Sequence, residues 1–427
     1  MRAWKWLYPG MGVKRWVVLI TLGVFLLALG LGGIFHLSGW AFPYQLEAVE
    51  VLAPAVGQHL DVGFAVAFIL AGGTLVVIGI RRVVLSITCV LSPCPAKDIV
   101  DVVYRERQLN RGPKIVVVGG GTGLSTMLRG LKEYTTNITA IVTTTDDGGS
   151  SGRLSEELGV LPPGDIRNNL VALADTEPLM EKLFQYRFSQ GNGLAGHSFG
   201  NLFLAAMTDI TGDFQEAIRL SSRVLAVRGL VLPSTLNRVV LEAEFTDGTR
   251  AKGECNIVAQ RKQIRRLQLD PRPEPTELAI SAIHEADLII LGPGSLYTSV
   301  LPNLLVPEIT DAIAQASALK LYVCNIMTQP GETDGYKASD HVRAVFDHVG
   351  FPIVEYVVIN NESLSPELAA RYANEGAYPV EVDVEALRAL GCKPVVSPLL
   401  NGRELARHDP GKLAQIIMHI LFKSRDE

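Results

Sequence analysis

The chain has 427 residues, of which 48% are hydrophobic and only 19% are charged. This composition excludes a disordered chain, and the length predicts two or three domains. Residues 1–110 carry 9 Lys/Arg and 6 Asp/Glu (+3), whereas the remainder carries 30 and 38 (−8). An acidic body of this kind excludes non-specific nucleic-acid binding as a function. Five cysteines without a CxxC pair predict neither a disulfide framework nor a structural zinc site, and they fit a reducing compartment.

Two long apolar runs stand near the start of the chain. Residues 17–35 and 62–80 each contain 19 residues without a charge, and a helix of that length reaches about 28 Å, close to the thickness of a bilayer core. Buried core helices rarely stay uncharged over this length. A signal peptide is an alternative for the first run, although this run is long for one and no clear cleavage site follows it. We expect residues 1–82 to form a membrane anchor of two transmembrane helices.

The basic residues near the two runs predict their orientation. Lys and Arg flank the outer ends of the runs, whereas the segment between them has three acidic residues and no Lys or Arg. By the positive-inside rule, both termini and the main domain are cytoplasmic, in a multi-pass protein of the cell membrane. The flanking basic residues are Arg2, Lys5, Lys14, Arg15, Arg81 and Arg82, and the aromatics expected at the interfaces are Trp16, Trp40 and Tyr44.

Residues 83–112 are expected to connect the anchor to the body. Val83–Leu91 is apolar and either packs at the membrane surface or continues the second helix, until Pro93-Cys94-Pro95 ends it. Lys97–Gln108 has the pattern of a short amphipathic helix, and Gly112-Pro113 precedes the first strand of the body.

The body, residues 113–427, alternates between short β-branched runs and helical stretches. This alternation predicts an α/β domain with a mainly parallel sheet covered by helices on both faces. Ligands of such sheets bind beyond the carboxyl ends of the strands. The expected strands are Lys114–Val118, Ile138–Thr143, Asp287–Leu291, Leu319–Asn325 and Ile353–Ile359; the expected helices are Thr126–Tyr134, Pro178–Phe188, Asp213–Ala226, Pro307–Ala316, Ser339–His348 and Lys412–Phe422.

One segment of the body departs from this alternation. Arg238–Phe245 and Arg250–Val258 flank Asp247-Gly248, which is a typical hairpin turn. We expect a small antiparallel insertion at about residues 230–272, ending in the proline-rich stretch 271–275.

The first strand of the body leads into a glycine-rich loop. Gly120, Gly121, Thr122 and Gly123 separate it from a helix, and the amides of such a loop, together with the helix N-terminus, favour an anion such as a phosphate. The run matches neither GxGxxG nor the Walker pattern, so a tight strand-to-helix turn remains the alternative.

The second strand leads into a pair of carboxylates, Asp146 and Asp147, followed by Ser150 and Ser151. The pair could hold Mg²⁺ against a diphosphate or accept hydrogen bonds from a ribose. The alternative is an Asp-Gly turn whose side chains cap their own backbone.

Four further loops carry polar residues. Asp165 is expected as the N-cap of a helix that bears Asn168 in its first turn, and His197 and Asn201 lie where another loop enters a helix. A second glycine-rich turn presents hydroxyls and a tyrosine ring that could stack on a base, and a fifth strand exit follows Asn325. The residues of the second turn are Gly292, Pro293, Gly294, Ser295, Tyr297 and Thr298. Several such loops at one end of a sheet predict a nucleotide-type ligand.

Six runs of the body also occur in a distinctive order: GGGTGLSTMLRGL, DDGGSSGRL, PPGDIRNNLVALAD, GHSFGNLFLAAMT, ADLIILGPGSLYTSVLPNLLVPEI and NIMTQPGETDGY. Through them, residues 113–410 resemble the gluconeogenesis factor (YvcK-like) family of the wider 2-phospho-L-lactate transferase (CofD-like) superfamily. The resemblance implies a Rossmann-like fold and a nucleotide-linked ligand, UDP-N-acetylglucosamine in the YvcK-like branch. The CofD-like branch instead transfers a phospholactyl group from a guanosine diphosphate carrier to a deazaflavin, using Mg²⁺.

The resemblance also assigns roles to residues. It implies that Gly120–Gly123 and Gly292–Ser295 cradle phosphates, that Tyr297 and Thr298 lie beside the nucleotide, and that Asp146 and Asp147 form an acidic motif. It places Asn168, His197 and Asn201 in a polar pocket. The membrane anchor departs from the family pattern, in which the usual member is a soluble cytoplasmic protein.

These features lead to one expected function and two alternatives. We expect a membrane-tethered regulator that binds a UDP-sugar, needs no cofactor, and links gluconeogenic carbon supply to cell-wall precursor synthesis and cell shape, with a cell-wall precursor enzyme as a candidate partner. The alternative is a phospholactyl transferase that uses Asp146, Asp147 and Mg²⁺. A dehydrogenase reading rests only on the strand-GGGTG-helix pattern. The sequence leaves the oligomeric state open.

Overall fold

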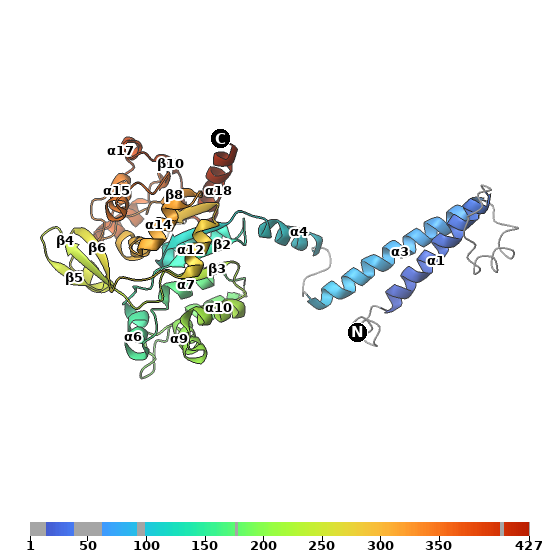
Figure 1. Cartoon of the computed structure of the whole chain (residues 1–427), viewed down its shortest axis with the longest axis horizontal. Helices are drawn as coiled ribbons and strands as arrows, with labels where there is room; N and C mark the ends of the chain where they lie inside the picture. Colours follow the sequence, from blue (N-terminus) through green and yellow to red (C-terminus); the bar gives the residue numbers. More distant parts are fainter. Residues whose placement is uncertain (1–13, 38–61, 92–98, 176–177, 402–404, 427) are drawn as a thin grey trace. The chain divides into compact units, whose positions relative to one another are not determined.

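The computed structural model describes residues 14–37, 62–91, 99–175, 178–401 and 405–426. Within them the chain divides into two compact units, Met1–Glu106 and Arg107–Glu427, drawn in Figure 1. The residues 38–61 and 92–98, which include Trp40, Tyr44 and the Pro93-Cys94-Pro95 break, lie outside the described residues.

The first unit is a pair of long helices, α1 (Lys14–Leu37) and α3 (Val62–Leu91). Both are long and apolar enough to cross a membrane, and only 11% and 17% of their most apolar segments are buried. They pack antiparallel at small residues, because Gly23 lies against the backbone of Gly72, and Gly30 lies against that of Ala65. Close approach at glycine and alanine is typical of helix pairs in lipid.

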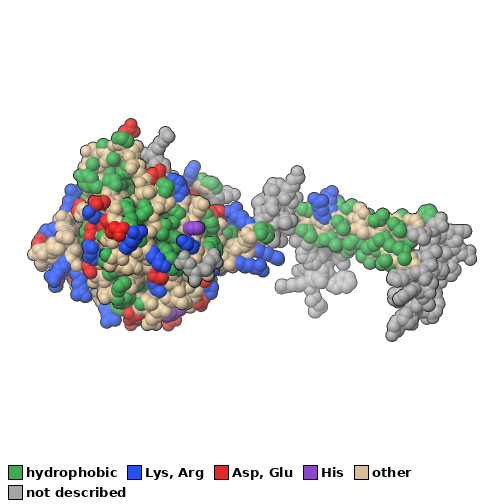
Figure 2. Space-filling model, turned by 90° about the horizontal axis from the view of Figure 1, so that it is seen from above, with side chains coloured by type: hydrophobic (Ala, Val, Ile, Leu, Met, Phe, Trp, Pro, Cys, Tyr) green, Lys and Arg blue, Asp and Glu red, His purple; other side chains and the backbone are tan. Residues whose placement is uncertain are grey.

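The basic residues of this pair lie at one end. The guanidinium groups of Arg15 and Arg82 are 4.8 and 5.4 Å from the centre of the Trp16 ring, which brings the start of α1 beside α3 after its apolar segment. Figure 2 shows the long apolar surface of the pair and the basic side chains at its end. The expected continuation of the second apolar run through Val83–Leu91 is confirmed, and α4 (Ile99–Asn110) matches the expected connector helix.

The second unit is built on a seven-stranded, entirely parallel sheet, as the alternating pattern predicted. Its strand order is β10-β9-β8-β7-β1-β2-β3. The order reverses between β1 and β7, so this point is where a ligand is expected. The strands are β1 (Ile115–Gly119), β2 (Ile138–Val142), β3 (Leu230–Pro233), β7 (Leu288–Leu291), β8 (Leu319–Val323), β9 (Tyr356–Asn360) and β10 (Lys393–Ser397).

Helices cover both faces of the sheet (Figure 1). Successive residues of a strand point to opposite faces, so Val116 and Val118 join one buried cluster whereas Ile115 and Val117 join the other. The helices are α5 (Gly121–Leu131), α6 (Gly149–Leu158), α7 (Gly164–Leu173), α8 (Pro178–Gln185), α9 (Phe199–Thr211), α10 (Phe214–Val224), α12 (Glu277–His284), α13 (Leu301–Leu304), α14 (Pro307–Gln315), α15 (Ala338–Val349), α16 (Pro366–Asn374), α17 (Val384–Ala389) and α18 (Pro410–Asp426).

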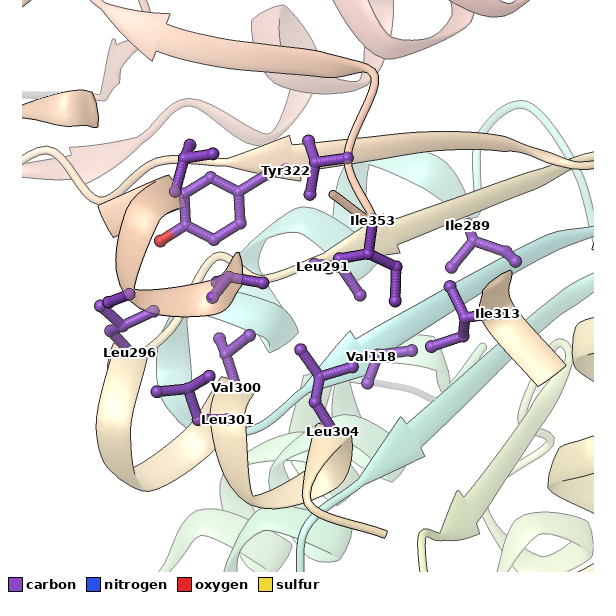
Figure 3. Packing of buried hydrophobic residues seen from close by; sticks show 14 of the residues in the cluster. Val118, Ile289, Leu291, Leu296, Val300, Leu301, Leu304, Ile313, Tyr322 and Ile353 are labelled. Carbon is purple, nitrogen blue, oxygen red and sulfur yellow. The ribbon is translucent and has the colours of Figure 1, made fainter. Parts of the chain in front are cut away.

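The segment after β7 is held firmly against the sheet. A π-helical turn, η2 (Leu296–Val300), runs directly into α13. Figure 3 shows Leu296, Val300 and Leu304 of this segment packed in one cluster with Val118 and Leu291 of the sheet. The second glycine-rich turn is therefore anchored by buried apolar side chains.

The insertion differs from the predicted hairpin in two ways. The strand β5 (Arg250–Lys252) is short, and the chain then forms α11 (Glu254–Ala259) where the alternation predicted a strand to Val258. A third strand, β6 (Ile264–Asp270), pairs antiparallel with β4 (Val240–Phe245). The predicted start at about residue 230 is wrong, because Leu230–Pro233 is the edge strand β3 of the main sheet.

Other predictions are also corrected by the structure. Asp165 was expected as the N-cap of its helix, but it lies in the first turn of α7, whose N-cap is Pro163. The strand expected from Ile353 begins at Tyr356, and β10 was not expected at all. A short two-stranded pair, β11 (Leu400–Asn401) and β12 (Arg407–His408), follows β10.

Candidate ligand-binding site

A large cavity lies where the strand order reverses. It has a volume of about 820 Å³, and it is lined by the loops after β1, β2, β7 and β8, by α11 of the insertion, and by Leu405–His408. Loops far apart in the sequence therefore meet at one edge of the sheet, as predicted. A cavity of this size can hold a dinucleotide-sized or sugar-nucleotide ligand.

The first glycine-rich turn forms one wall of the cavity. Helix α5 begins at Gly121, which has a φ of +68°. Gly120 lies directly against the carboxylate of Asp165, and a Cβ on Gly123 would lie only 2.9 Å from the carbonyl oxygen of Pro293. Glycine is therefore required by contact with neighbouring groups as well as by the turn itself.

The N-terminus of α5 offers amides to an anion. The first amides of a helix have no partner within the helix. The Gly121 amide is bonded to the Asp165 carboxylate, while Thr122 and Gly123 line the cavity. The wall thus has donors and the positive end of a helix dipole, which favour a phosphate.

The second glycine-rich turn also lines the cavity, but two of its amides donate to side chains of the protein. The amide of Gly294 donates to Asn325 Oδ1 at 3.2 Å, and the Asn325 amide group donates back to the Gly294 carbonyl at 2.7 Å. The amide of Tyr297 donates to Glu332 at 3.3 Å. That Gly292–Ser295 cradles a phosphate stays a prediction, and the Gly294 amide is not available for it while it donates to Asn325.

Tyr297 is not beside the cavity. Its side chain is 2% exposed, its hydroxyl lies 2.7 Å from that of Tyr336, and its ring packs edge-on against Tyr336 and His348. Burial raises the pKa of the Tyr297 hydroxyl above its ordinary value. The prediction that this ring stacks on a base is wrong, because π-helical η2 turns it into the core, whereas Thr298 does line the cavity.

Only one of the two predicted carboxylates lies in the cavity wall. Asp146 lines the cavity and accepts the Gly148 amide at 3.0 Å. Asp147 is exposed, accepts the amide of Cys255 at 3.0 Å and so ties the β2 loop to α11. Asp165, rather than Asp147, is the second carboxylate beside Asp146.

Four carboxylates converge on the cavity: Asp146, Asp165, Glu254 and Glu332. Burial, followed by the charge of Asp146, raises the pKa of Asp165 to about 6. Burial and the surrounding carboxylates raise the pKa of Glu254 to about 9. Such clustering of perturbed carboxylates in a cavity is typical of functional sites.

The donor set of this acidic wall suits a divalent cation that also binds a ligand. No group of three or more His, Cys, Asp and Glu within the described residues is arranged to hold a metal. Mg²⁺ commonly binds one or two carboxylates together with phosphate oxygens, and Asp146 and Asp165 could provide the two carboxylates.

The remaining predicted residues form a buried network behind this wall. His197 Nδ1 lies 3.0 Å from Ser150 Oγ, and Asn201 Nδ2 donates to Ser150 and Ser151 at 3.2 and 3.4 Å. Burial lowers the pKa of His197. None of these four residues lines the cavity, so they support the site instead of forming its surface.

Arg167 connects this network to Asn168. Its guanidinium donates to Ser198 Oγ at 2.5 Å, to Asn201 Oδ1 at 3.0 Å and to Asn168 Oδ1 at 2.7 Å. Its side chain lies directly against Gly200, where a Cβ would be 2.6 Å from Arg167 Cδ. Asn168 therefore holds an arginine in place.

Sequence reasoning missed Glu254, Glu332 and the Arg407–His408 segment as parts of the cavity wall. Glu254 had no usable signal, because its segment was predicted as a strand. Glu332 stood within a quoted strand-exit run, and its burial could have been suspected from that position.

Comparisons with known proteins show the family of this chain. The family model of 2-phospho-L-lactate transferase CofD matches residues 115–400. A putative gluconeogenesis factor of Nostoc sp. is 51% identical over 97% of this chain and 91% of its own length. The chain belongs to the gluconeogenesis factor branch of the CofD family.

Relatives in this family differ in how much of the chain they cover. The gluconeogenesis factor of Bacillus subtilis is 51% identical over 73% of this chain and 99% of its own length. A crystal structure of a UPF0052 family member from Bacillus halodurans matches with a TM-score of 0.70 and 52% identity, over 72% of this chain and 99% of that one. The Nostoc alignment includes most of the N-terminal region, whereas these two proteins are matched over nearly their whole length without it. The Bacillus halodurans protein therefore folds without such a region.

Proposed function

We propose that this protein binds a nucleotide-diphosphate sugar, UDP-N-acetylglucosamine, in the cavity between β1 and β7. The observation that carries the proposal is the N-terminus of α5, where Thr122 and Gly123 face a cavity of about 820 Å³. Amides and a helix dipole at that position stabilise a diphosphate. The choice of the uridine sugar rests on membership of the gluconeogenesis factor branch.

The acidic wall requires a counter-charge for this ligand. Four carboxylates would repel a diphosphate if they were all ionised. Mg²⁺ held by Asp146 and Asp165 and by the phosphate oxygens would remove that repulsion. The raised pKa of Glu254 acts in the same direction, because a neutral carboxyl does not repel the ligand.

We further propose that α1 and α3 tether the body to the cytoplasmic face of the cell membrane. Their length, apolar surface and shared basic end support this arrangement. The tether would hold a regulator near membrane-associated enzymes of cell-wall precursor synthesis, at a raised effective concentration. The name gluconeogenesis factor in relatives supports a role in carbon supply, and we propose that this role is linked to cell-wall precursor synthesis and cell shape.

Titration of residues 107–427 with UDP-N-acetylglucosamine, in the presence of Mg²⁺, tests the ligand by calorimetry. We expect saturable binding that weakens when Mg²⁺ is removed with a chelator. Gly411→Ala serves as the control for substitutions of glycine in the cavity wall, because its new Cβ makes only an ordinary contact of 3.4 Å with Asp409. Absence of binding at millimolar ligand would overturn the proposal.

A transferase is the second candidate function. The match to the CofD family model and the convergence of Asp146 with Asp165 favour it. Incubation with a phospholactyl-guanosine diphosphate donor, a deazaflavin and Mg²⁺ tests this activity. Formation of a phospholactyl-deazaflavin would establish an enzyme, and no product would exclude this reaction.

A further inference from the structure

The two glycine-rich turns use their amides differently. At the first turn, Thr122 and Gly123 at the N-terminus of α5 line the cavity, while the Gly121 amide is bonded to Asp165. At the second, the amide of Gly294 donates to Asn325 and that of Tyr297 donates to Glu332. These two amides of the second turn are therefore not available to a phosphate.

Glu332 occupies the position where an anion would otherwise bind to this second turn. Its side chain is 6% exposed, and it accepts Ser295 Oγ–H at 2.6 Å and the Tyr297 amide at 3.3 Å. Thr298 also donates to it, through both its amide and its hydroxyl. No Lys or Arg of the described residues forms a salt bridge with Glu332, so neutral donors alone hold this carboxylate.

This arrangement decides what the hydroxyls of the second turn can do. A serine or threonine hydroxyl has one proton and two lone pairs. Because Ser295 and Thr298 direct their protons at Glu332, their oxygens present only lone pairs to the cavity that both residues line. This wall accepts hydrogen bonds, which an ionised phosphate oxygen cannot donate, so it selects against a phosphate.

We propose that Glu332 is a specificity-determining residue. Because of it, the second turn binds a ligand ring that bears hydroxyl or N–H donors. The ligand then has one orientation, with its phosphates at Thr122–Gly123 and a donor-bearing ring, either the ribose or the second sugar, at Ser295 and Thr298. This inference rests on the proposed binding of a nucleotide sugar. It adds the orientation of the ligand and the residue that enforces it.

Glu332→Gln tests the inference with three ligands: pyrophosphate, UDP and UDP-N-acetylglucosamine, each with the same Mg²⁺ concentration. Glutamine keeps the size of the side chain, but its NH₂ group can donate to Ser295 and free the Ser295 proton to point into the cavity. We expect pyrophosphate to bind as tightly as before or more tightly, because the substitution removes no donor to the phosphates and glutamine cannot carry a negative charge. Each larger ligand should bind more tightly than the one before it, and we call each such gain in affinity an increment. In Glu332→Gln we expect one increment, from pyrophosphate to UDP or from UDP to the sugar nucleotide, to be about tenfold smaller.

The increment that is lost identifies the ring. A loss at the first increment places the ribose beside Glu332, and a loss at the second places the sugar there. A merely structural role for Glu332 would weaken all three ligands by the same factor and lower the melting temperature. That outcome, or unchanged affinity for all three, would overturn the inference.

Ser295→Ala is the second variant and carries the test if Glu332→Gln does not fold. It removes the lone pairs of the hydroxyl and leaves the carboxylate, so it should reduce the same increment by a smaller factor. If wild-type protein binds UDP and the sugar nucleotide equally, UDP-N-acetylglucosamine is overturned as the ligand. The gain in affinity from pyrophosphate to UDP, compared between wild type and Glu332→Gln, still tests the role of Glu332. Wild-type protein that binds none of the three ligands overturns both proposals.

Discussion

The two glycine-rich turns of the cavity look alike in sequence and differ in use. Each follows a buried strand of the same parallel sheet, and each leads into a helical segment. At the first, Thr122 and Gly123 line the cavity and only the Gly121 amide is bonded to a side chain, Asp165. At the second, the amides of Gly294 and Tyr297 donate to Asn325 and Glu332. A glycine-rich strand exit can therefore bind a phosphate only through those amides that no side chain of the protein occupies.

The largest effect is expected from closing the first turn. Gly123→Ala would place a Cβ 2.9 Å from the carbonyl oxygen of Pro293, which is backbone and cannot move aside easily. We expect at least about a 30-fold loss of pyrophosphate affinity, equivalent to about 2 kcal/mol. Calorimetry measures the affinity, and Gly411→Ala serves as the control. Equal affinity in Gly123→Ala and wild type would remove this turn from the phosphate site.

Asn325→Ala tests the second turn. It removes three hydrogen bonds, two with Gly294 and one with Gln329, and leaves a partly buried amide without its acceptor. We expect a loss of about 1–3 kcal/mol in the free energy of unfolding. Pyrophosphate affinity should fall by less than about threefold, because the Gly294 amide is not a phosphate ligand in wild type. A loss as large as that of Gly123→Ala would show that both turns hold the phosphate.

Glu254→Gln tests the acidic wall without a ligand. The pKa of Glu254 in the folded protein is about 9, above its ordinary value of 4.5, so the folded state binds this proton more tightly than the unfolded state. Its contribution to stability is complete below pH 4.5 and is lost as the pH rises toward 9. We expect Glu254→Gln to stabilise the protein by about 1–2 kcal/mol at pH 8, discounted for partial exposure, and to have little effect at pH 4.5. The melting temperatures of wild type and Glu254→Gln, measured between pH 4.5 and pH 8, test this. A difference between the two proteins that stays constant with pH would contradict the expectation.

The smallest effect on binding is expected from Tyr297→Phe. The ring lies in the core, and the substitution removes only the hydrogen bond to Tyr336. We expect a loss of about 1 kcal/mol in stability and no change beyond about twofold in affinity for UDP. A tenfold weaker affinity for UDP, at unchanged affinity for pyrophosphate, would return this ring to the nucleotide site.

Much of the body could be predicted because its signals are local. The β-branched run of β1 and the glycines that follow it define a strand, a turn and a helix within a few residues, and Asp146 follows β2 in the same way. Glu254 could not be predicted, because its place in the cavity depends on the bond between Asp147 and the Cys255 amide, 108 residues apart. The prediction for Tyr297 failed for a similar reason. The alternation of the sequence places the η2 segment in a loop, and only packing against His348 and Tyr336 turns the Tyr297 ring inward.

By itself, the sequence determined the two long apolar helices, the parallel α/β body and the edge of the sheet at which polar loops gather. Those properties follow from hydrophobic periodicity and from glycine at strand ends, which act over short stretches of chain. Only the tertiary structure decided which amides remain available, that Asp165 replaces Asp147 beside Asp146, and that Glu254 and Glu332 complete an acidic wall. Those outcomes depend on which side chain lies within hydrogen-bond distance of a donor on another loop of the sheet. Which buried groups are hydrogen-bonded is a property of the packed molecule.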